Sequence, residues 1–419
     1  MKTLVIVITL LTFLSSCQAT TMRKNDPGGK AVIYNKAFQE LPERVRPNDA
    51  TISYYQARYH NLIQRRKSQN RLYIVKPKGN AVDFRYELNK SSLILEKELS
   101  EGYILSYLFY ENGVIKYNGK AKDGRFNKNI DDETRFFSHS TGKSITSYIL
   151  GHAICQGYIS SMDEVIDWPM MSKTLYQGQR IRDLLNMNAG DRHIVDKRST
   201  RIKGSRLHHR DMDLETIATF LEGTKRQGNG VFYNNFLADV IANYIAFKSG
   251  DNYDDLMRSV FQDKVKIKYS ISYEKHKSLG GTLKYWGDPQ TQASYSYHMV
   301  RTDFLRLAEA MMKDYQKQTC VGKYLKQARL QALTWPKYRP FKNNSKLWLH
   351  NYAKKYGAQF YFDFHGMDGR NVFGTEGFNG QNMMIDMDNS RIIVTNSAAT
   401  AWDQTVFMIN PIRDGALPK

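Results

Sequence analysis

Ser140-Thr141-Gly142-Lys143, at the head of an apolar segment that runs to Cys155, is the stretch that decides the fold. Four residues after it have the spacing of one buried helix face, namely Ile145, Tyr148, Ile149 and Ala153. Side chains three residues apart share a helix face, so the Lys143 amine is within reach of the Ser140 hydroxyl in the first turn. The helix dipole favours negative charge there by about 0.3–1 kcal/mol, which helps an alkoxide to form. The stretch predicts a serine nucleophile with a lysine partner.

Two alternatives compete with this interpretation. The same Ser-x-x-Lys spacing recurs at Ser272-Tyr273-Glu274-Lys275, in a charged stretch without a following apolar helix, which predicts an exposed segment. Gly142-Lys143-Ser144 is similar to the end of a phosphate-binding Walker motif, but that motif needs glycine where this chain has Phe137. Without that glycine the backbone cannot wrap a phosphate, so nucleotide binding is disfavoured.

The first residues predict an export signal. Lys2 precedes an apolar run from Leu4 to Leu14, which is too short to span a bilayer. The run ends in Leu14-Ser15-Ser16-Cys17, which resembles the lipobox of bacterial lipoproteins and implies acylation of Cys17. We therefore expect a signal peptide over 1–16, a lipidated tether over 17–30 and, because Gln18 follows the cysteine, a lipoprotein of the outer membrane facing the periplasm. The alternative is an ordinary cleaved signal with an incidental cysteine.

Composition indicates a globular protein with acidic partners. Of 419 residues, 41% are hydrophobic and 24% are charged, which is enough to bury a large core. The formal net charge is +20, or +19 after loss of Lys2 with the signal. For an exported lipoprotein this charge favours anionic envelope polymers over nucleic acid as partners, and solvated surface lysines are the alternative.

No metal or cofactor is expected. His208-His209 and the pair Asp386 and Asp388 lack partners at ligand spacing, and the second pair is typical of a hairpin end beside Asn389-Ser390. Beyond Cys17 the chain has only Cys155 and Cys320, which allow one disulfide. A free, buried thiol is the expected state of Cys155 at the end of its apolar helix.

The order of the elements predicts an α+β fold. A strand over 103–110 turns at Asn112-Gly113 into a second strand over 114–117, and strands return at 359–364, 383–385 and 392–395. Helical patterns lie between, including a stripe of Phe236, Val240, Tyr244 and Phe247 and a helix capped by Thr302 or Asp303. We expect an antiparallel sheet built from both ends of a domain over 99–415, flanked by helices and a helical lobe at about 150–310, after an extension over 31–98.

A second motif, Tyr233-Asn234-Asn235, precedes the Phe236 stripe. A phenol and an amide two residues apart at a helix start can face one pocket. Tyr233, as a phenolate near a lysine cation, would accept the Ser140 proton and return it to the leaving group. Asn235 would hold Lys143 or a substrate carbonyl. The same pattern at Tyr59-His60-Asn61 lies in a polar stretch before the nucleophile and is interpreted as structural.

A third motif lies near the C-terminus, at 374–381, and reads Gly-Thr-Glu-Gly-Phe-Asn-Gly-Gln. Glycines along a strand edge allow close backbone approach, which suits an edge that pairs with substrate and lends an amide to an oxyanion. A glycine-rich bulge without function is the alternative.

Together and in this order, the three motifs resemble the serine β-lactamase and penicillin-recognising superfamily, in its class C-like branch with 6-aminohexanoate-dimer hydrolase-like enzymes. The resemblance runs from about Gly102 to Ser397 and includes 181–190, similar to that family's helix and turn after the nucleophile helix. It implies a β-lactamase-like fold in which Ser140 is the nucleophile and Lys143 and Tyr233 exchange protons. It also implies an oxyanion hole from the Ser140 and Phe378 amides.

The third motif departs from that family. β-Lactamases usually carry Lys-Thr-Gly there, whereas this chain has Thr375-Glu376-Gly377, so a substrate carboxylate would be held poorly. With Asn235, these three residues are the predicted substrate-binding set. We expect a serine hydrolase that cleaves an ester or amide through an acyl-enzyme, with a D-amino-acid peptidase or a non-enzymatic polymer-binding lipoprotein as alternatives.

Overall fold

The structure, a computed structural model, describes most of the chain from residue 72 onward. The described ranges are 72–121, 130–195, 201–203, 214–274, 294, 296–339, 348–398, 400 and 402–419. Nearer the N-terminus it also describes strands β1 (Ala19–Thr21) and β2 (Ile33–Asn35), which pair antiparallel within the predicted tether and extension. No helix in these ranges combines the length and the apolar character that a bilayer span requires.

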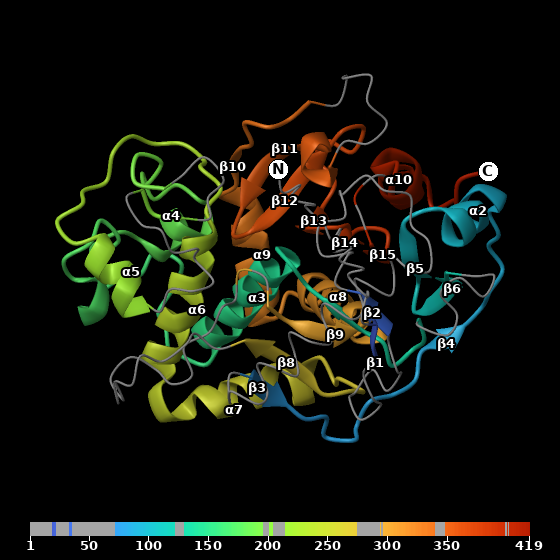
Figure 1. Cartoon of the computed structure of the whole chain (residues 1–419), viewed down its shortest axis with the longest axis horizontal. Coiled ribbons are helices and arrows are strands. Elements are labelled where there is room, and N and C mark those ends of the chain that lie inside the picture. The colour runs from blue at the N-terminus through green and yellow to red at the C-terminus, as the bar shows by residue number, and fades with distance from the viewer. Residues whose placement is uncertain are drawn as a thin grey trace, which may run out of the picture.

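One large sheet contains strands from both ends of the chain (Figure 1). Its strands, in spatial order, are β10 (Leu333–Thr334), β11 (Ala353–Gly357), β12 (Phe360–Phe364), β13 (Val372–Gly377), β14 (Gln381–Asp386), β15 (Arg391–Ser397), β5 (Ile104–Glu111), β6 (Val114–Lys120) and β4 (Arg85–Tyr86). The register between β15 and β5, which pairs Arg391 with Glu111 and Val394 with Leu108, joins the two ends. The predicted sheet is confirmed, except that β4 pairs with β6 in parallel.

The β5–β6 hairpin turns where the sequence predicts it. Asn112 and Gly113 both have positive φ, 51° and 89°, as the two central residues of a type I′ turn require. Both faces of β5 are covered. Residues three apart on a strand point to opposite faces, so Tyr107 reaches the carbonyl of Phe407 near the C-terminus while Tyr110 reaches Glu309 on the other side. The sheet is therefore buried between two helical layers.

A second, smaller sheet lies at the far side of the nucleophile helix. Its strands are β3 (Leu72–Val75), β8 (Ile271–Glu274), β9 (His298–Val300) and β7 (Arg135–Phe137). Ser272, Tyr273 and Glu274 of β8 are buried, so the prediction that this second Ser-x-x-Lys copy is exposed was wrong; Lys275 lies outside the described residues. Because β3 and β4 pair into the two sheets, the described part of the predicted extension, from residue 72, belongs to the domain.

Most of the helices come, in sequence order, between the N-terminal strands and the C-terminal strands of the large sheet. Their bounds are α2 (Leu93–Glu101), α3 (Thr141–Cys155), α4 (Ile181–Leu185), α5 (Leu214–Phe220), α6 (Asn235–Ser249), α7 (Tyr253–Arg258), α8 (Arg301–Gln316), α9 (Cys320–Leu330) and α10 (Asn410–Asp414). Shorter helical turns are η2 (Pro169–Met171), η4 (Gly250–Asn252), η5 (Ser259–Lys264), η6 (Leu349–Tyr352) and η7 (Thr405–Ile409). Helices α4, α5 and α6 form the lobe on the left of Figure 1, and α3 lies between this lobe and the sheet.

The start of α8 differs from the prediction. The helix begins at Arg301, after Val300, so neither Thr302 nor Asp303 is its cap. The Asp303 carboxylate instead accepts hydrogen bonds from the backbone amides of Lys268 and Tyr269, at 2.9 and 3.0 Å. The tertiary contact with the loop before β8 therefore replaces the local capping role.

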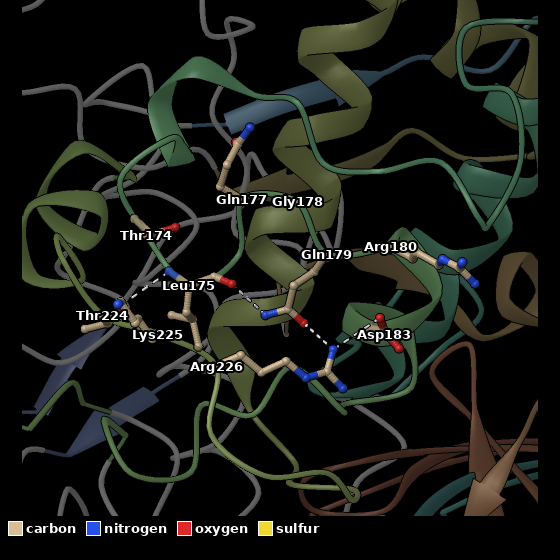
Figure 2. Close-up of a pocket in the computed structure, with 10 residues that line it drawn as sticks. All are labelled: Thr174, Leu175, Gln177, Gly178, Gln179, Arg180, Asp183, Thr224, Lys225 and Arg226. Atoms are coloured by element: carbon tan, nitrogen blue, oxygen red, sulfur yellow. Dashed lines mark hydrogen bonds and ion pairs between the residues drawn. The ribbon is translucent and has the colours of Figure 1, made fainter.

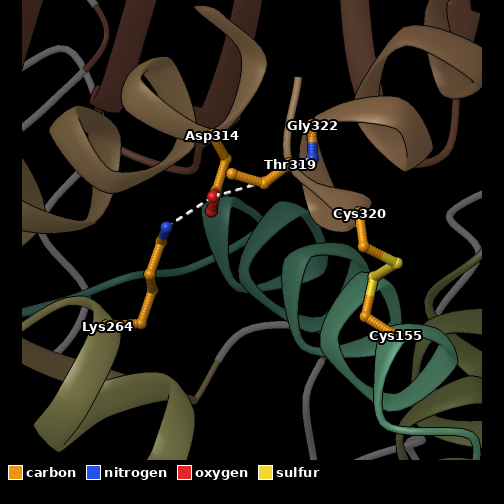
Figure 3. The surroundings of a disulfide bond; sticks show 6 residues. All are labelled: Cys155, Lys264, Asp314, Thr319, Cys320 and Gly322. Carbon is orange, nitrogen blue, oxygen red and sulfur yellow. Dashed lines mark hydrogen bonds and ion pairs between the residues drawn. A yellow bond between two sulfur atoms is a disulfide. The ribbon is translucent and has the colours of Figure 1, made fainter. Parts of the chain in front are cut away.

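Cys155 and Cys320 form a disulfide, so the prediction of a free thiol at Cys155 was wrong (Figure 3). The bond joins the last residue of α3 to the first residue of α9, 165 residues apart in sequence. Beside it, Asp314 at the end of α8 accepts hydrogen bonds from Thr319 and Lys264. Only the packing of α9 against α3 brings the two cysteines together, and the spacing in the sequence does not show it.

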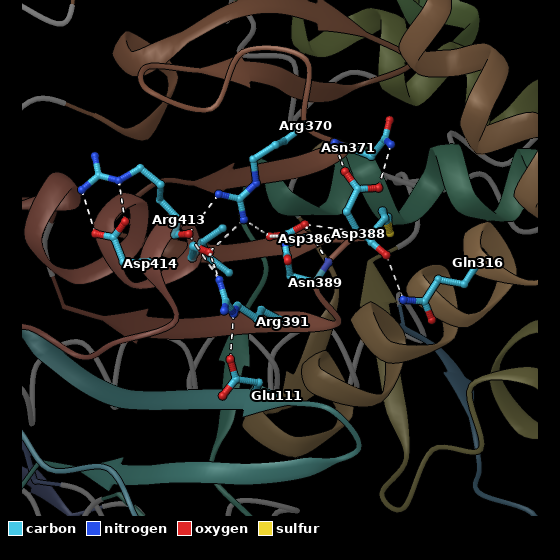
Figure 4. Close-up of polar contacts among 12 residues, drawn as sticks. Glu111, Gln316, Arg370, Asn371, Asp386, Asp388, Asn389, Arg391, Arg413 and Asp414 are labelled. Carbon is cyan, nitrogen blue, oxygen red and sulfur yellow. Dashed lines mark hydrogen bonds and ion pairs between the residues drawn. The ribbon is translucent and has the colours of Figure 1, made fainter.

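The turn after β14 is a polar junction (Figure 4). Asp386 accepts hydrogen bonds from the backbone amides of Asp388 and Asn389, at 3.1 and 3.2 Å, which confirms the predicted hairpin end. Arg370 donates to Asp386 and to the carbonyl of Arg413 at the end of α10. The carboxylates of this turn therefore fix the C-terminal helix to the sheet.

Candidate active site

The Lys143 amine is the centre of the first motif. It is 1% exposed and lies 3.1 Å from Ser140 Oγ, 2.8 Å from Asn235 Oδ1 and 3.0 Å from the carbonyl oxygen of Ser294. The Ser294 carbonyl is held in turn because the Ser294 amide donates to Asp239 of α6 at 2.9 Å. The first and second motifs thus meet at one buried nitrogen.

Ser140 lies at the junction of β7 and α3. The backbone reaches it through His139, whose φ of 45° is in the left-handed region that side chains other than glycine rarely adopt. Thr141, the next residue, bonds to the carbonyl of Gln381 on β14 at 2.5 Å and lies 3.2 Å from the Thr375 hydroxyl on β13. Ser140 is therefore fixed between the helix and the large sheet.

Tyr233 lies against both residues of the first motif. Its ring face is 4.8 Å from Lys143 Nζ, and its hydroxyl is hydrogen-bonded with Ser140. Burial raises the pKa of Tyr233 well above 10, Glu376 adds to this increase, and the Ser140 hydrogen bond opposes it. Burial therefore favours the neutral phenol over the phenolate that the sequence analysis expected.

The second motif is positioned from behind by Asp191. Asn234 caps α6 by accepting a hydrogen bond from the Phe236 amide at 2.8 Å, and its amide group donates to Asp191 Oδ2 at 2.5 Å. Asp191 is fully buried and also accepts a hydrogen bond from Tyr176. Burial raises its pKa to about 6, against the effect of these hydrogen bonds. With Asn234 turned inward, Tyr233 and Asn235 on either side reach Ser140 and Lys143.

The third motif divides between two roles. Thr375 is fully buried, and its hydroxyl accepts a hydrogen bond from Met383 and contacts Thr141, so it holds the sheet to α3. Gly377 is needed for close approach, because a β-carbon there would lie 2.4 Å from the Ser138 carbonyl oxygen. Of the Thr-Glu-Gly set, Glu376 alone lines the cavity beside Ser140.

The strand that carries this motif is not a sheet edge. β13 lies between β12 and β14, so the predicted free edge was wrong. Its pairing with β12 is recorded only between Gly374 and Tyr361, whereas its pairing with β14 runs to Gly377. Residues after Gly374 therefore diverge from β12, and the cavity opens beside them.

The cavity next to Ser140 has a volume of about 180 Å³. Five of its residues are aromatic, namely Tyr233, Trp335, Trp348, Tyr361 and Phe378, and the others are Ser140, Lys337, His350 and Glu376. The backbone amides of Ser140 and Phe378 have no hydrogen-bond acceptor among the described residues, as the predicted oxyanion hole requires. The arrangement places a hydroxyl, an amine and a phenol at one end of an aromatic-walled chamber.

Several of these residues could not be identified from the sequence. Trp335, Lys337, Trp348 and His350 follow β10 or precede β11, and no motif marks them. Ser294 contributes only a carbonyl, so its side chain gives no signal. Cys17, His208-His209 and Tyr59-His60-Asn61 lie outside the described residues, and the described ranges contain no group of three or more His, Cys, Asp or Glu side chains that suits a metal ion.

A second cavity, of about 440 Å³, lies in the helical lobe away from the three motifs (Figure 2). Three of its polar side chains, those of Gln179, Asp183 and Arg226, are linked by hydrogen bonds. Arg226 donates to Gln179 at 3.0 Å and to Asp183 at 3.3 Å, and Gln179 donates to the carbonyl of Leu175. These pairings stabilise the loop after α5.

The comparisons with known proteins show the fold. No family model and no curated protein matches the sequence. A provisionally named 6-aminohexanoate-dimer hydrolase from Bacillus anthracis is similar in structure with a TM-score of 0.57 at 13% identity, covering 86% of this chain and 92% of that chain. A D-stereospecific amidohydrolase from Streptomyces sp. gives 0.50 at 14% identity, covering 75% and 95%. A penicillin binding protein from Bacillus halodurans gives 0.50 at 13%, covering 74% and 95%.

Proposed function

From the premise that this chain has the fold of the serine β-lactamase and penicillin-binding superfamily, we propose that it is a serine hydrolase that cleaves an ester or amide through an acyl-enzyme on Ser140. One observation carries the proposal. Lys143 Nζ lies 3.1 Å from Ser140 Oγ, and the Tyr233 hydroxyl bonds to the same serine from a different part of the chain. A nucleophile bonded to two groups that can exchange protons is the constellation that acyl transfer requires.

The hydrogen-bond partners of Lys143 suit a general base. Two of them, Asn235 Oδ1 and the Ser294 carbonyl, can only accept, whereas a serine hydroxyl can also donate. A neutral amine satisfies all three when its two N–H groups donate to the acceptors and its lone pair faces Ser140. In that state Lys143 takes the Ser140 proton as Oγ attacks the substrate carbonyl.

The remaining groups complete the acylation half-reaction. The amides of Ser140 and Phe378 hold the oxyanion, and one such donor is typically worth about 10²- to 10³-fold in rate. The neutral Tyr233 phenol protonates the leaving group and regains its proton from Lys143. The leaving alcohol or amine then departs with Ser140 acylated.

Glu376 restricts the substrate. A buried carboxylate lines the cavity where β-lactamases usually hold a substrate carboxylate with a cation, so β-lactam hydrolysis is disfavoured. Esters and amides without a carboxylate at that position, or with an amine, fit better. Amides of D-amino acids are the second candidate, favoured by the structural similarity to a D-stereospecific amidohydrolase.

Activity-based labelling tests the proposal. A fluorophosphonate probe is expected to label the protein and to lose labelling in Ser140→Ala. Ser147→Ala, on the same helix with its hydroxyl bonded to Tyr324, is the matched control and should label like the wild type. A panel of ester, amide and D-Ala-D-Ala substrates then separates the candidates. Undiminished labelling of Ser140→Ala would place the nucleophile elsewhere, and an unlabelled wild type that binds anionic polymers would favour a non-enzymatic role.

We also propose that the enzyme is anchored in the outer membrane, facing the periplasm, through acylated Cys17. The support is the apolar run and lipobox-like residues at 4–17, and the charge of +20 suits contact with anionic envelope polymers. Metabolic labelling with a palmitate analogue should mark the wild type and not Cys17→Ser. Labelling that persists in the variant would show that another site is acylated.

A further inference from the structure

His350 and Glu376 form a carboxylate–histidine pair in the wall of the Ser140 cavity. His350 Nδ1 lies 2.5 Å from Glu376 Oε2. The same carboxylate accepts the backbone amides of Leu349 and His350, at 2.7 and 3.2 Å, where the turn η6 begins. Glu376 is 6% exposed, so three donors hold it in one orientation. A carboxylate fixed in this way sets the tautomer of its histidine, with the proton on Nδ1 and the lone pair on Nε2.

The second ring nitrogen is available to the cavity. His350 lines the chamber, and its Nε2 has no hydrogen-bond partner among the residues that the structure describes. Aromatic rings fix the plane of the imidazole, with Tyr361 stacked at a centroid distance of 6.0 Å and Trp335 edge-on at 5.8 Å. The cavity of about 180 Å³ has room for on the order of six water molecules, so a water can be accommodated in the cavity that His350 and Ser140 both line.

The acylation groups are poorly suited to the second half-reaction. Lys143 is enclosed on the Oγ side of Ser140, where Asn235 and Ser294 occupy its other contacts. Burial favours the protonated form of Tyr233, so this phenol is suited to donate a proton and not to accept one from water. Water that attacks the acyl carbonyl must come from the open chamber, which is the side that His350 lines.

We propose that His350, oriented by Glu376, is the base that activates water to hydrolyse the acyl-enzyme. This inference rests on the proposed function and adds a residue to it. The water O–H bond breaks and its proton goes to His350 Nε2, while the hydroxide oxygen bonds to the acyl carbon. When the C–Oγ bond breaks, the electron pair returns to Ser140 Oγ, which takes a proton from Tyr233; the His350 proton returns to Tyr233 through solvent. The products are a carboxylic acid and the free serine.

The charged and titratable groups around this histidine come from five parts of the chain. They are Glu376 on β13, Lys337 after β10, Tyr361 on β12, Tyr233 before α6 and Lys143 on α3. Lys337 lies 5.7 Å from the Trp335 ring, and burial lowers its pKa. Among these described groups Glu376 is hydrogen-bonded to the imidazole, so it is the positioning residue whose removal should change the pH dependence most.

His350→Gln tests the proposal by separating the two half-reactions. The variant should react with a fluorophosphonate at a rate within about twofold of the wild type, because acylation does not use His350. With a p-nitrophenyl ester it should give a burst and then turn over about 10²- to 10⁴-fold more slowly, with the acyl-enzyme visible by intact mass. His365→Gln, whose ring bonds to Tyr338 outside the cavity, is the control and should show no burst. Normal labelling with deacylation within threefold of the wild type would overturn the proposal.

The pH dependence of the wild-type protein gives a second test, which does not depend on whether a variant folds. Decay of isolated acyl-enzyme should rise with pH through a single inflection, as removal of a water proton by a base requires. In Glu376→Gln this pH dependence should change, because the base has lost the carboxylate that orients it. Decay that is independent of pH between 5 and 8 would contradict the proposal. Failure of the wild type to label at all would instead refute the acyl-enzyme on Ser140, so the two failures are distinguishable.

Discussion

The two ends of the Ser140 cavity carry ionisable groups of opposite type, a basic amine and an acidic carboxyl group. Each group is buried and makes three polar contacts. At one end Lys143, a buried amine, contacts three oxygen atoms, from Ser140, Asn235 and Ser294. At the other end Glu376, a buried carboxylate, accepts three hydrogen bonds, from Leu349 and from the backbone and ring of His350. Each of these ionisable groups has three hydrogen-bond partners, which compensate for the loss of water on burial.

The difference between the two ends is how far apart in sequence their parts lie. Ser140 and Lys143 share one helical turn, so the nucleophile end has a local motif. The opposite wall is assembled from the loop around 335–350, from β12 and from β13, which meet only in the folded sheet. The Ser140–Lys143 pair is therefore set by a local sequence motif. The wall that faces it, which we propose selects and releases the substrate, is formed only by the tertiary fold.

The largest expected effect comes from removing the amine at the nucleophile end. Lys143→Met keeps an unbranched side chain of similar size and loses the proton acceptor, so fluorophosphonate labelling should slow by about 10²- to 10⁴-fold. Lys337→Met removes an amine from the opposite wall and should slow labelling less than tenfold. Equal losses in the two variants would show that the cavity as a whole, and not the contact with Ser140, sets reactivity.

The covalent anchor of the nucleophile helix gives the next effect. Replacing Cys155 and Cys320 by serine should lower the free energy of unfolding by about 2–4 kcal/mol, because the disulfide closes a long loop. Urea unfolding with and without reductant measures it. The reduced wild type should match the double variant. A wild type whose stability does not change on reduction would contradict the structure of this anchor.

Asp191, which lies behind the Ser140 end of the cavity, should make the free energy of unfolding depend on pH below about 6. Its folded pKa of about 6 exceeds the ordinary 3.8, so the folded protein binds this proton more tightly. The Asp191 contribution to the free energy of unfolding should therefore fall as pH rises from about 4 to 6, by up to about 3 kcal/mol. Urea unfolding at pH 4 and pH 7 should show this fall in the wild type and not in Asp191→Asn.

Other buried groups contribute to the same pH range, and they explain why the variant is needed. Burial raises the pKa of Asp303 to about 6 and lowers that of His152 to about 4, which act in opposite directions. Asp303 and His152 are present in both proteins. Their contributions therefore cancel when the pH dependence of the free energy of unfolding in Asp191→Asn is subtracted from that of the wild type. An unchanged pH dependence in Asp191→Asn would show that Asp191 does not titrate in this range.

The smallest effects separate two adjacent amides. Asn234→Ala removes the cap of α6 and should lower the free energy of unfolding by about 0.5–2 kcal/mol. Asn235→Ala removes one of the two acceptors of Lys143 and should instead slow labelling by up to about tenfold, since a hydrogen bond between neutral groups is worth about 0.5–1.5 kcal/mol. The reverse pattern would mean that the two side chains have exchanged roles.

The sequence was sufficient for several of the main elements and for the contact between Ser140 and Lys143, because both depend on short-range periodicity. The α3 and α6 stripes, the hairpin at Asn112-Gly113 and the hairpin at 386–390 were all predictable. The Cys155–Cys320 bond was not, because helix packing across 165 residues decides it.

The protonation and hydrogen bonding of the site residues were harder to predict than which residues form the site. Tyr233 was predictable as a residue, but its protonation depends on burial by segments far away in sequence. His350 lies in a stretch with no motif, and its partner Glu376 was noticed only as a departure from the usual cation. Glycines near the third motif indicated close approach, yet they could not show that β13 is an interior strand.

Peptide mapping of the acyl-enzyme tests the central claim most directly. The protein is mixed with a p-nitrophenyl ester, quenched in acid after the burst and digested, and the mass of each peptide is measured. We predict that the acyl mass is carried by Ser140 alone and is absent from Ser140→Ala. Hydrolysis of the ester with the adduct on another residue, or an adduct that persists in Ser140→Ala, would contradict the account.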